Sequence, residues 1–195
     1  MIRISPRAVP VLLLGFLLVA PPAFGQRVAR HEGYWISFGL GGGSAVGDDA
    51  FDGDSKFGGA FFLRMGGSPS QRLLICGEIS GWATDKDDVE IARGATLFTA
   101  LYYPSEAGGL YVKGGAGFAV RTAERTVLAP ELPPGEFGTV TFSEDDSGIG
   151  LGAGLGYDIQ LARNFFLTPA LDLVYTGTEG DGASLLLFTV GATWH

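Results

Sequence analysis

The segment from Ser147 to Thr176 constrains the fold more than any other stretch, because its side chains alternate with a period of two. In its first half, apolar side chains from Ile149 to Ile159 alternate with glycines, and the glycine face ends in Asp158 and Gln160. This period is typical of a β-strand, in which successive side chains point to opposite faces. After a tight turn the alternation resumes, with Phe165, Leu167, Leu171, Leu173 and Tyr175 on one face and Thr168, Ala170, Asp172 and Thr176 on the other. The pattern predicts a β-hairpin whose strands are long enough to cross a bilayer at a tilt.

Six further segments alternate in the same way and complete an eight-stranded pattern. They span residues 33–44, 56–66, 72–84, 91–103, 109–122 and 183–194. The connections are alternately short and long, as in transmembrane barrels with short periplasmic turns and longer external loops. The sequence therefore predicts an all-β fold, an eight-stranded antiparallel up-and-down transmembrane β-barrel. The longest connection, Ala123 to Asp146, contains three prolines and is expected to be non-strand.

The two faces of the predicted strands favour a membrane barrel over a soluble one. One face carries bulky apolar residues with aromatic ends, while the other is mainly Gly, Ala, Ser and Thr, too small for a solvated exterior. Bulky residues should therefore face lipid. In the fourth strand we expect Ala95, Leu97, Thr99, Leu101 and Tyr103 to face outward, and Thr96, Phe98, Ala100 and Tyr102 to face inward. The glycines should make room for large internal residues: Trp35, Phe62, Trp82, Phe98 and Tyr102.

The N-terminus is typical of a secretory signal peptide. Arg3 and Arg7 precede an apolar core of about 10 residues, which is short of the ~20 that a spanning helix needs. The small-residue pattern that follows predicts cleavage near Gly25. We therefore expect a signal peptide over residues 1–25 and a barrel domain over residues 26–195.

Composition excludes several classes of function. The net charge of −8 argues against nucleic acid as a partner. Cys76 is the only cysteine, so neither an intramolecular disulfide nor a thiolate metal cluster is expected. The glycine-rich runs lie within alternating strands with no helix after them, unlike dinucleotide-binding fingerprints. We therefore expect no cofactor.

Two short runs of the sequence carry a resemblance to a known group of proteins. Residues 154–158 (GLGYD) and 164–169 (NFFLTP) resemble the small outer-membrane β-barrel proteins of Gram-negative bacteria, the OmpA/OmpX/OmpW-like barrels. The resemblance implies location in the cell outer membrane, contact with outer-membrane lipid and insertion by the barrel-assembly machinery. Such barrels also carry a proline at the position of Pro169. They typically end on an aromatic residue, whereas here Trp194 is followed by His195.

Six charged residues belong to the face predicted to be internal: Arg64, Glu78, Lys113, Arg121, Asp158 and Asp172. Buried charges cost several kcal/mol each unless they are paired. We expect Asp158 and Asp172 to be counter-charges for Arg64, Lys113 or Arg121. The simpler interpretation is a structural ion-pair network that plugs the barrel, and the alternative is a polar conduit or gate. Open flow is disfavoured because eight strands enclose only enough space for side chains.

Other candidate sites are weaker. The acidic groups Asp48, Asp49, Asp52, Asp54 and Asp85, Asp87, Asp88, Glu90 could hold Ca²⁺ or Mg²⁺ or bridge lipid headgroups, but they lack EF-hand spacing, and solvated acidic loops are the simpler explanation. His31 and His195 should both lie at the periplasmic rim, so a Ser–His hydrolase at the outer rim lacks its base. We therefore expect a non-enzymatic barrel with a structural or surface-interaction role, binding any surface ligand through acidic loops. The alternative is a narrow channel for small or hydrophobic molecules.

Overall fold

The computed structural model describes residues 33–46, 56–86, 89–106, 108–128, 139–178 and 181–195. Its strands are β1 (Gly33–Val46), β2 (Lys56–Ser70), β3 (Leu73–Lys86), β4 (Val89–Tyr102), β5 (Leu110–Leu128), β6 (Thr139–Tyr157), β7 (Ile159–Ala162), β8 (Phe165–Thr178) and β9 (Asp181–Trp194). Within these ranges no helix has the length and apolarity needed to cross a membrane. The predicted signal peptide, the acidic segment 48–54 and residues 87–88 of the second acidic segment lie outside the described residues.

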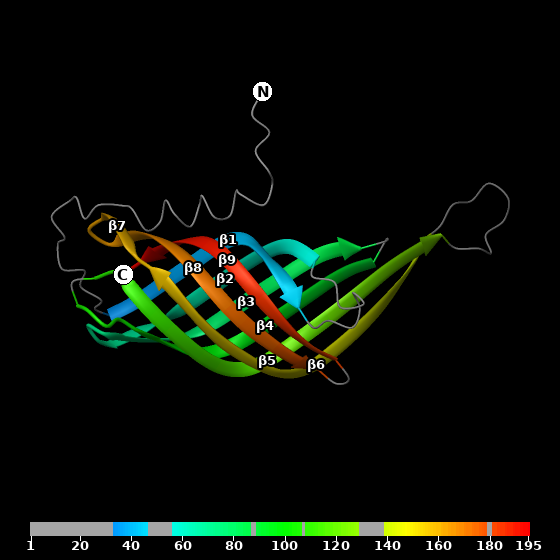
Figure 1. Ribbon diagram of the computed structural model, residues 1–195, viewed down its shortest axis with the longest axis horizontal. Coiled ribbons are helices and arrows are strands. Elements are labelled where there is room, and N and C mark those ends of the chain that lie inside the picture. The colour runs from blue at the N-terminus through cyan, green and yellow to red at the C-terminus, as the bar shows by residue number, and fades with distance from the viewer. Residues whose placement is uncertain (1–32, 47–55, 87–88, 107, 129–138, 179–180) are drawn as a thin grey trace, which may run out of the picture.

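The strands form one closed antiparallel sheet in which neighbours along the chain are neighbours in space (Figure 1). The ring closes where β1 pairs with β9, and β6 and β7 pair one after the other with β8. Because β6 and β7 together occupy one position, the ring has eight positions, which confirms the predicted up-and-down barrel. The short connections β2–β3, β4–β5 and β7–β8 lie at one end, called the turn end, and the opposite end is called the loop end (Figure 1).

The break between β6 and β7 is explained by a proline on the neighbouring strand. Gly156 pairs with Ala170 and Ile159 pairs with Leu167, so the register is the same on both sides of the break. This register places Pro169 opposite the break, and proline has no N–H to donate to the ladder. The N–H of Asp158 instead donates to the carbonyl of Gly109, 2.8 Å away, on the other side.

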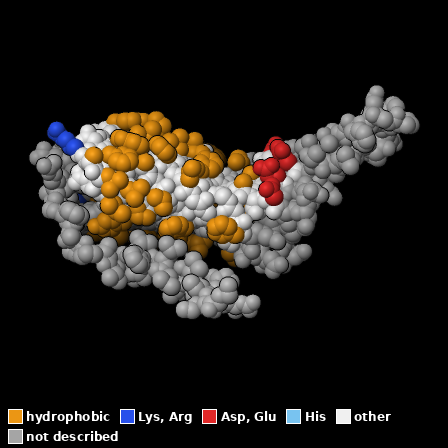
Figure 2. Space-filling model, turned by 90° about the horizontal axis from the view of Figure 1, so that it is seen from above, with side chains coloured by type: hydrophobic (Ala, Val, Ile, Leu, Met, Phe, Trp, Pro, Cys, Tyr) orange, Lys and Arg blue, Asp and Glu red, His pale blue; other side chains and the backbone are white. Residues whose placement is uncertain are grey.

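The outer surface carries the bulky apolar residues, as expected for a face in contact with lipid. Figure 2 shows hydrophobic side chains over the body of the barrel and acidic side chains gathered toward one end. At the turn end, Trp194 packs against Phe165 and Phe38, with ring centroids 4.7 and 5.7 Å apart. This grouping matches the aromatic girdle that flanks the apolar band of outer-membrane barrels.

The face assignment predicted for β4 is wrong. Leu97 and Leu101 are each 2% exposed and lie inside, together with Tyr103, Ala95 and Thr99, whereas Phe98 is 68% exposed and Tyr102 also lies outside. Both faces of β4 carry large apolar side chains, so hydrophobicity alone does not choose between them. The informative residue is Arg93, which lies on the same face of the strand as Leu97 and is buried inside. If the odd-numbered residues of β4 faced outward, as predicted, this arginine would point toward the lipid side of the barrel.

The prediction of a non-strand connection from Ala123 to Asp146 is also wrong over most of its length. β5 continues to Leu128 and β6 begins at Thr139, with pairs from Arg121–Asp146 to Leu128–Thr139. The two strands project beyond the rest of the barrel at the loop end (Figure 1). β-branched residues in both segments favour this extension. The prolines that suggested a loop, residues 130, 133 and 134, lie outside the described residues.

Two apolar clusters fill the inside of the barrel, one toward each end. The cluster toward the turn end contains Trp35, Leu74, Cys76, Leu101, Tyr103 and Tyr111. The other, called the apolar layer, contains Ala45, Ala60, Trp82, Ile91, Ala95, Leu97, Val174, Leu185 and Leu187. Along β3, Cys76 belongs to the first cluster and Trp82 to the second, and Glu78 lies between them. The candidate site is therefore a charged layer enclosed between two apolar ones.

Candidate functional site: the filled lumen

Four of the six predicted internal charges meet in one cluster, called the ion-pair quartet. It consists of Arg64 from β2, Glu78 from β3, Lys113 from β5 and Asp172 from β8. Arg64 Nε lies 3.1 Å from Glu78 Oε2, and Arg64 Nη2 lies 2.9 Å from Asp172 Oδ2. Lys113 Nζ contacts Glu78 Oε1 and lies 3.2 Å from Asp172 Oδ1. Each cation bridges both carboxylates, so the quartet is charge-balanced and ties four strands together.

The quartet is almost completely shielded from solvent. The side chains of Arg64, Glu78 and Lys113 are at most 1% exposed, and that of Asp172 is 4% exposed. Arg64 also donates to the hydroxyl of Tyr111, at 3.2 Å, and its guanidinium lies over the Phe62 ring, 3.9 Å from the centroid. Buried charges are tolerated only with partners of this kind.

The glycine face of β6 makes room for the quartet. Gly154 pairs with Lys113 on one side and with Asp172 on the other. A Cβ atom at Gly154 would overlap Asp172 Oδ1 and would lie 3.0 Å from Cε of Lys113. The neighbouring Gly156 leaves space for the hydroxyl of Tyr111 in the same way. The alternating glycines that identify β6 as a strand thus also leave the space that the charged side chains occupy.

Asp158 lies apart from the quartet, in a chain of hydroxyl groups. The Tyr103 hydroxyl donates to Asp158 Oδ2 at 2.7 Å, and the Thr168 hydroxyl donates to Oδ1 at 2.6 Å. Thr168 in turn lies 2.9 Å from the Thr193 hydroxyl, which lies 2.7 Å from that of Ser37. Among the described residues Asp158 has hydroxyl partners and forms no ion pair. The chain links β1, β9, β8, the β6–β7 junction and the end of β4.

Arg121 also lies away from the quartet. Its Nη1 is 3.3 Å from Asp146 Oδ2, and both side chains are partly exposed at the root of the β5–β6 hairpin. Beside them the Thr122 hydroxyl donates to Asp145 at 2.8 Å. These contacts join the two strands where they leave the barrel, so Arg121 braces the hairpin.

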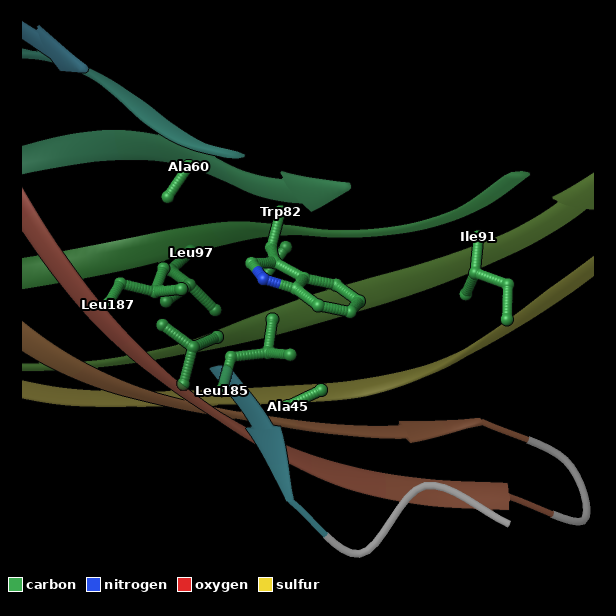
Figure 3. Packing of buried hydrophobic residues seen from close by; sticks show 9 residues of the cluster. Ala45, Ala60, Trp82, Ile91, Leu97, Leu185 and Leu187 are labelled. Carbon is green, nitrogen blue, oxygen red and sulfur yellow. The ribbon is translucent and has the colours of Figure 1, made fainter. Parts of the chain in front are cut away.

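The apolar layer lies next to the quartet inside the barrel, on its loop-end side. Figure 3 shows the indole of Trp82 lying across the interior near Leu185, with Leu97 and Leu187 beside it. The indole N–H donates to the carbonyl of Gly43 at 3.1 Å, so its polar atom is satisfied. Trp82 is 1% exposed, and Leu185 and Leu187 are similarly buried.

Sequence reasoning missed one buried internal charge, Arg93. Its Nη1 lies 3.4 Å from the Thr176 hydroxyl of β8. Arg93 was overlooked because the face assignment of β4 was inverted. The position of Arg93 on the same strand face as Leu97 is the signal that would have identified it.

The C-terminal residue lies against the turn end of the lumen. The ring of His195 stacks on Trp35 with centroids 6.1 Å apart, and meets Phe166 edge-on at 5.2 Å. The other histidine, His31, lies outside the described residues. Within the described segments no group of three or more His, Cys, Asp or Glu side chains is arranged to hold a metal ion.

A closed barrel with bulky residues outside and a balanced charge cluster inside defines the class: an outer-membrane β-barrel protein of the Gram-negative cell envelope. The family model described as the autotransporter β-domain matches residues 80–185, more than half of the chain. The chain therefore belongs to the autotransporter β-domain family. No curated protein sequence matches the chain.

Solved structures show the same fold at low sequence identity. Ail, the attachment invasion locus protein of Yersinia pestis, solved with the heparin analogue sucrose octasulfate, is 15% identical with a TM-score of 0.58, over 84% of this chain and 99% of that one. Neisserial surface protein A is 14% identical with a TM-score of 0.57, over 84% and 97%. A major outer membrane protein from Thermus thermophilus is 16% identical with a TM-score of 0.50, over 83% and 98%. These similarities agree with the resemblance to small outer-membrane barrels.

Proposed function

We propose that this protein is a closed, non-enzymatic outer-membrane barrel with a structural or surface-contact role, whose lumen is plugged by its own side chains. The observation that carries the proposal is the ion-pair quartet lying directly beneath the apolar layer. A conduit for solutes would have to pass both.

The energetics of the two layers favour a plug over a gate. Moving one member of the quartet away would leave an uncompensated charge in a buried site, which costs several kcal/mol. Displacing Trp82 and Leu185 would open a cavity of poorly packed side chains. Since eight strands enclose only enough space for side chains, either layer would have to displace other side chains in order to move.

Conductance in planar lipid bilayers tests this proposal. We expect the purified, folded protein to give no steady current steps. The matched variant is Trp82→Gly combined with Leu185→Ala, which removes bulk from the apolar layer, and the control is Phe98→Ala, which removes a ring from the outer face. If the unmodified barrel conducts, and conductance is lost when bulk is added at Ala60→Phe, the narrow-channel alternative is correct.

The surface-contact role is proposed to act through the loop end, where the described exposed charges are acidic. They are Asp85, Glu90, Glu124, Glu144 and Asp145. Ail was solved with a polyanion, sucrose octasulfate, but carboxylates repel sulfate groups, so a surface ligand of this chain should carry positive charge. Binding of fluorescent polylysine, and no binding of heparin, by cells that display the protein is the expected result.

Three further expectations about biogenesis belong to the same proposal. Cleavage near Gly25 predicts a mature chain that begins at Gln26, which N-terminal sequencing of membrane-extracted protein would check. The exposed apolar band supports contact with outer-membrane lipid. Trp194, which lies on the outer face at the end of β9, supports insertion by the barrel-assembly machinery despite the extra His195.

A further inference from the structure

A groove of about 700 Å³ runs over the outer surface of β1 to β5. Its walls are the outward side chains Leu40, Phe61, Ile79 and Val120, and its floor is made of Gly59, Gly81, Gly94, Ala83 and Ala92. The absence of bulk on the floor is what hollows the surface. Above Gly59 a Cβ atom would meet nothing within 4 Å, and the Phe61 ring leans over Gly81.

Because of its position on the barrel, the groove is expected to be filled by hydrocarbon chains. Its walls belong to the exposed apolar band: Phe61 and Ile79 are each 46% exposed. This band is the part of an outer-membrane barrel that faces lipid chains. Phe61 stands on one side of the groove and Val120 on the other, so a chain lying between them has more contacts than a chain on the convex surface.

One end of the groove is acidic on three adjacent strands. The next outward residue beyond Ala83 on β3 is Asp85, beyond Ala92 on β4 it is Glu90, and beyond Thr122 on β5 it is Glu124. Two residues along a strand span about 7 Å. Asp85 pairs with Glu90, and Glu90 pairs with Glu124, so three exposed acidic residues occupy paired positions on neighbouring strands across the end. Like charges directly opposite on neighbouring strands destabilise each other, and a cation between them relieves this.

We propose that the groove binds a cationic amphiphile, with its hydrocarbon chain between Phe61 and Val120 and its amine or ammonium head against Asp85, Glu90 and Glu124. An anionic lipid fits poorly, because its phosphate would meet the three carboxylates. A second copy of the barrel also fits poorly, because a two-fold interface places the same patch on both subunits and would bring two acidic rows together. The proposal does not depend on a closed lumen, but it shares Asp85, Glu90 and Glu124 with the surface-contact role proposed above.

Photolabelling of the folded barrel in phosphatidylcholine nanodiscs tests the proposal. The probes are a hexadecylamine with a diazirine at the chain end and the carboxylic acid and alcohol of matched length. We expect the amine to label peptides of β2 to β5 roughly tenfold more than the acid, a ratio that corresponds to ~1.4 kcal/mol. Equal labelling by all three probes would show ordinary lipid contact and would overturn the proposal without any variant.

Two variants separate the head from the chain. The triple variant Asp85→Asn, Glu90→Gln, Glu124→Gln should make labelling by the amine equal to that by the alcohol. Gly59→Phe should fill the groove and abolish preferential labelling there, whereas Gly77→Phe, at an outward glycine with equally open space outside the groove, should leave it unchanged. A preference for the amine that survives the triple variant, or labelling that survives Gly59→Phe, would contradict the assignment.

Discussion

The ion-pair quartet and the apolar layer fill neighbouring levels of one lumen by different physics. On β3, Glu78 and Trp82 are four residues apart and point the same way. The quartet depends on pairing: each charge requires partners from other strands at about 3 Å. The apolar layer depends on volume, and several side chains of similar size would satisfy it. A single substitution should therefore lower the free energy of unfolding more in the quartet than in the apolar layer. A compensating second substitution should also restore more of that free energy in the quartet.

The largest effect is expected from Glu78→Leu. The change leaves Arg64 and Lys113 sharing Asp172 alone, so the lumen holds one uncompensated positive charge. Removing one partner from a buried ion pair costs about 3–5 kcal/mol. Urea unfolding of the barrel in lipid vesicles, followed by tryptophan fluorescence, would measure the loss in free energy of unfolding.

The control for this prediction is the double variant Glu78→Leu with Lys113→Met. It restores charge balance, leaving Arg64 with Asp172, and keeps the apolar stem of the lysine. We expect it to be more stable than Glu78→Leu alone, because buried pairs are often replaced by apolar residues at little cost. A double variant as unstable as the single one would mean that packing and not charge governs this level.

A smaller loss is expected from Leu185→Ala in the apolar layer. The substitution removes buried volume beside Trp82 and leaves no charge without a partner. Comparable substitutions in protein cores cost about 2–5 kcal/mol, depending on how far the neighbouring side chains close the space. Leu185→Met is the matched control and should cost less than about 1.5 kcal/mol, since it conserves volume. A large loss for Leu185→Met in the same urea titration would show that the layer requires shape as well as volume.

The difference between the two layers also explains which strand faces could be predicted from the sequence. The period of two predicted the barrel and the inward and outward faces of most strands, because on those strands the charged residues share a face with small residues and the bulky apolar residues lie on the other face. On β4 the inner face carries leucines, such as Leu97, and the outer face carries Phe98, so the two faces have similar hydrophobicity and the pattern lost its contrast. Only Arg93 carried the missing information.

The grouping of the charges could be predicted only in part. Alternation puts Arg64, Glu78, Lys113 and Asp172 on the inner face, but the distances depend on strand stagger, which single residues do not encode. Asp158 could not be separated from the quartet without knowing that Tyr103 faces inward. For Arg121, the continuation of β5 and β6 decided the partner, and the prolines further along had hidden that continuation.

A still smaller effect is expected from Gly154→Ala, which tests the space beneath the quartet. The added methyl would overlap Asp172 Oδ1 and press on Lys113. Overpacking of this kind costs about 1–3 kcal/mol. Gly114→Ala on β5 is the control, because a Cβ there meets nothing within 4 Å. Equal stability of the two variants would show that the quartet can shift to accommodate a methyl group.

The smallest effect is expected from the same chemistry at the surface. Arg72 Nε lies 3.0 Å from Glu106 Oε1, as close as the quartet's pairs, but the two side chains are 50% and 54% exposed. Arg72→Ala should cost about 0.2–1 kcal/mol, because water solvates both charges whether or not they are paired. Unfolding titrations at low salt and at about 1 M salt would separate the cases: screening should erase the Arg72 effect and leave the Glu78→Leu effect intact, since buried charges are screened much less. If salt reduced both effects equally, the quartet would have to be accessible to ions, and the proposed plug would be wrong.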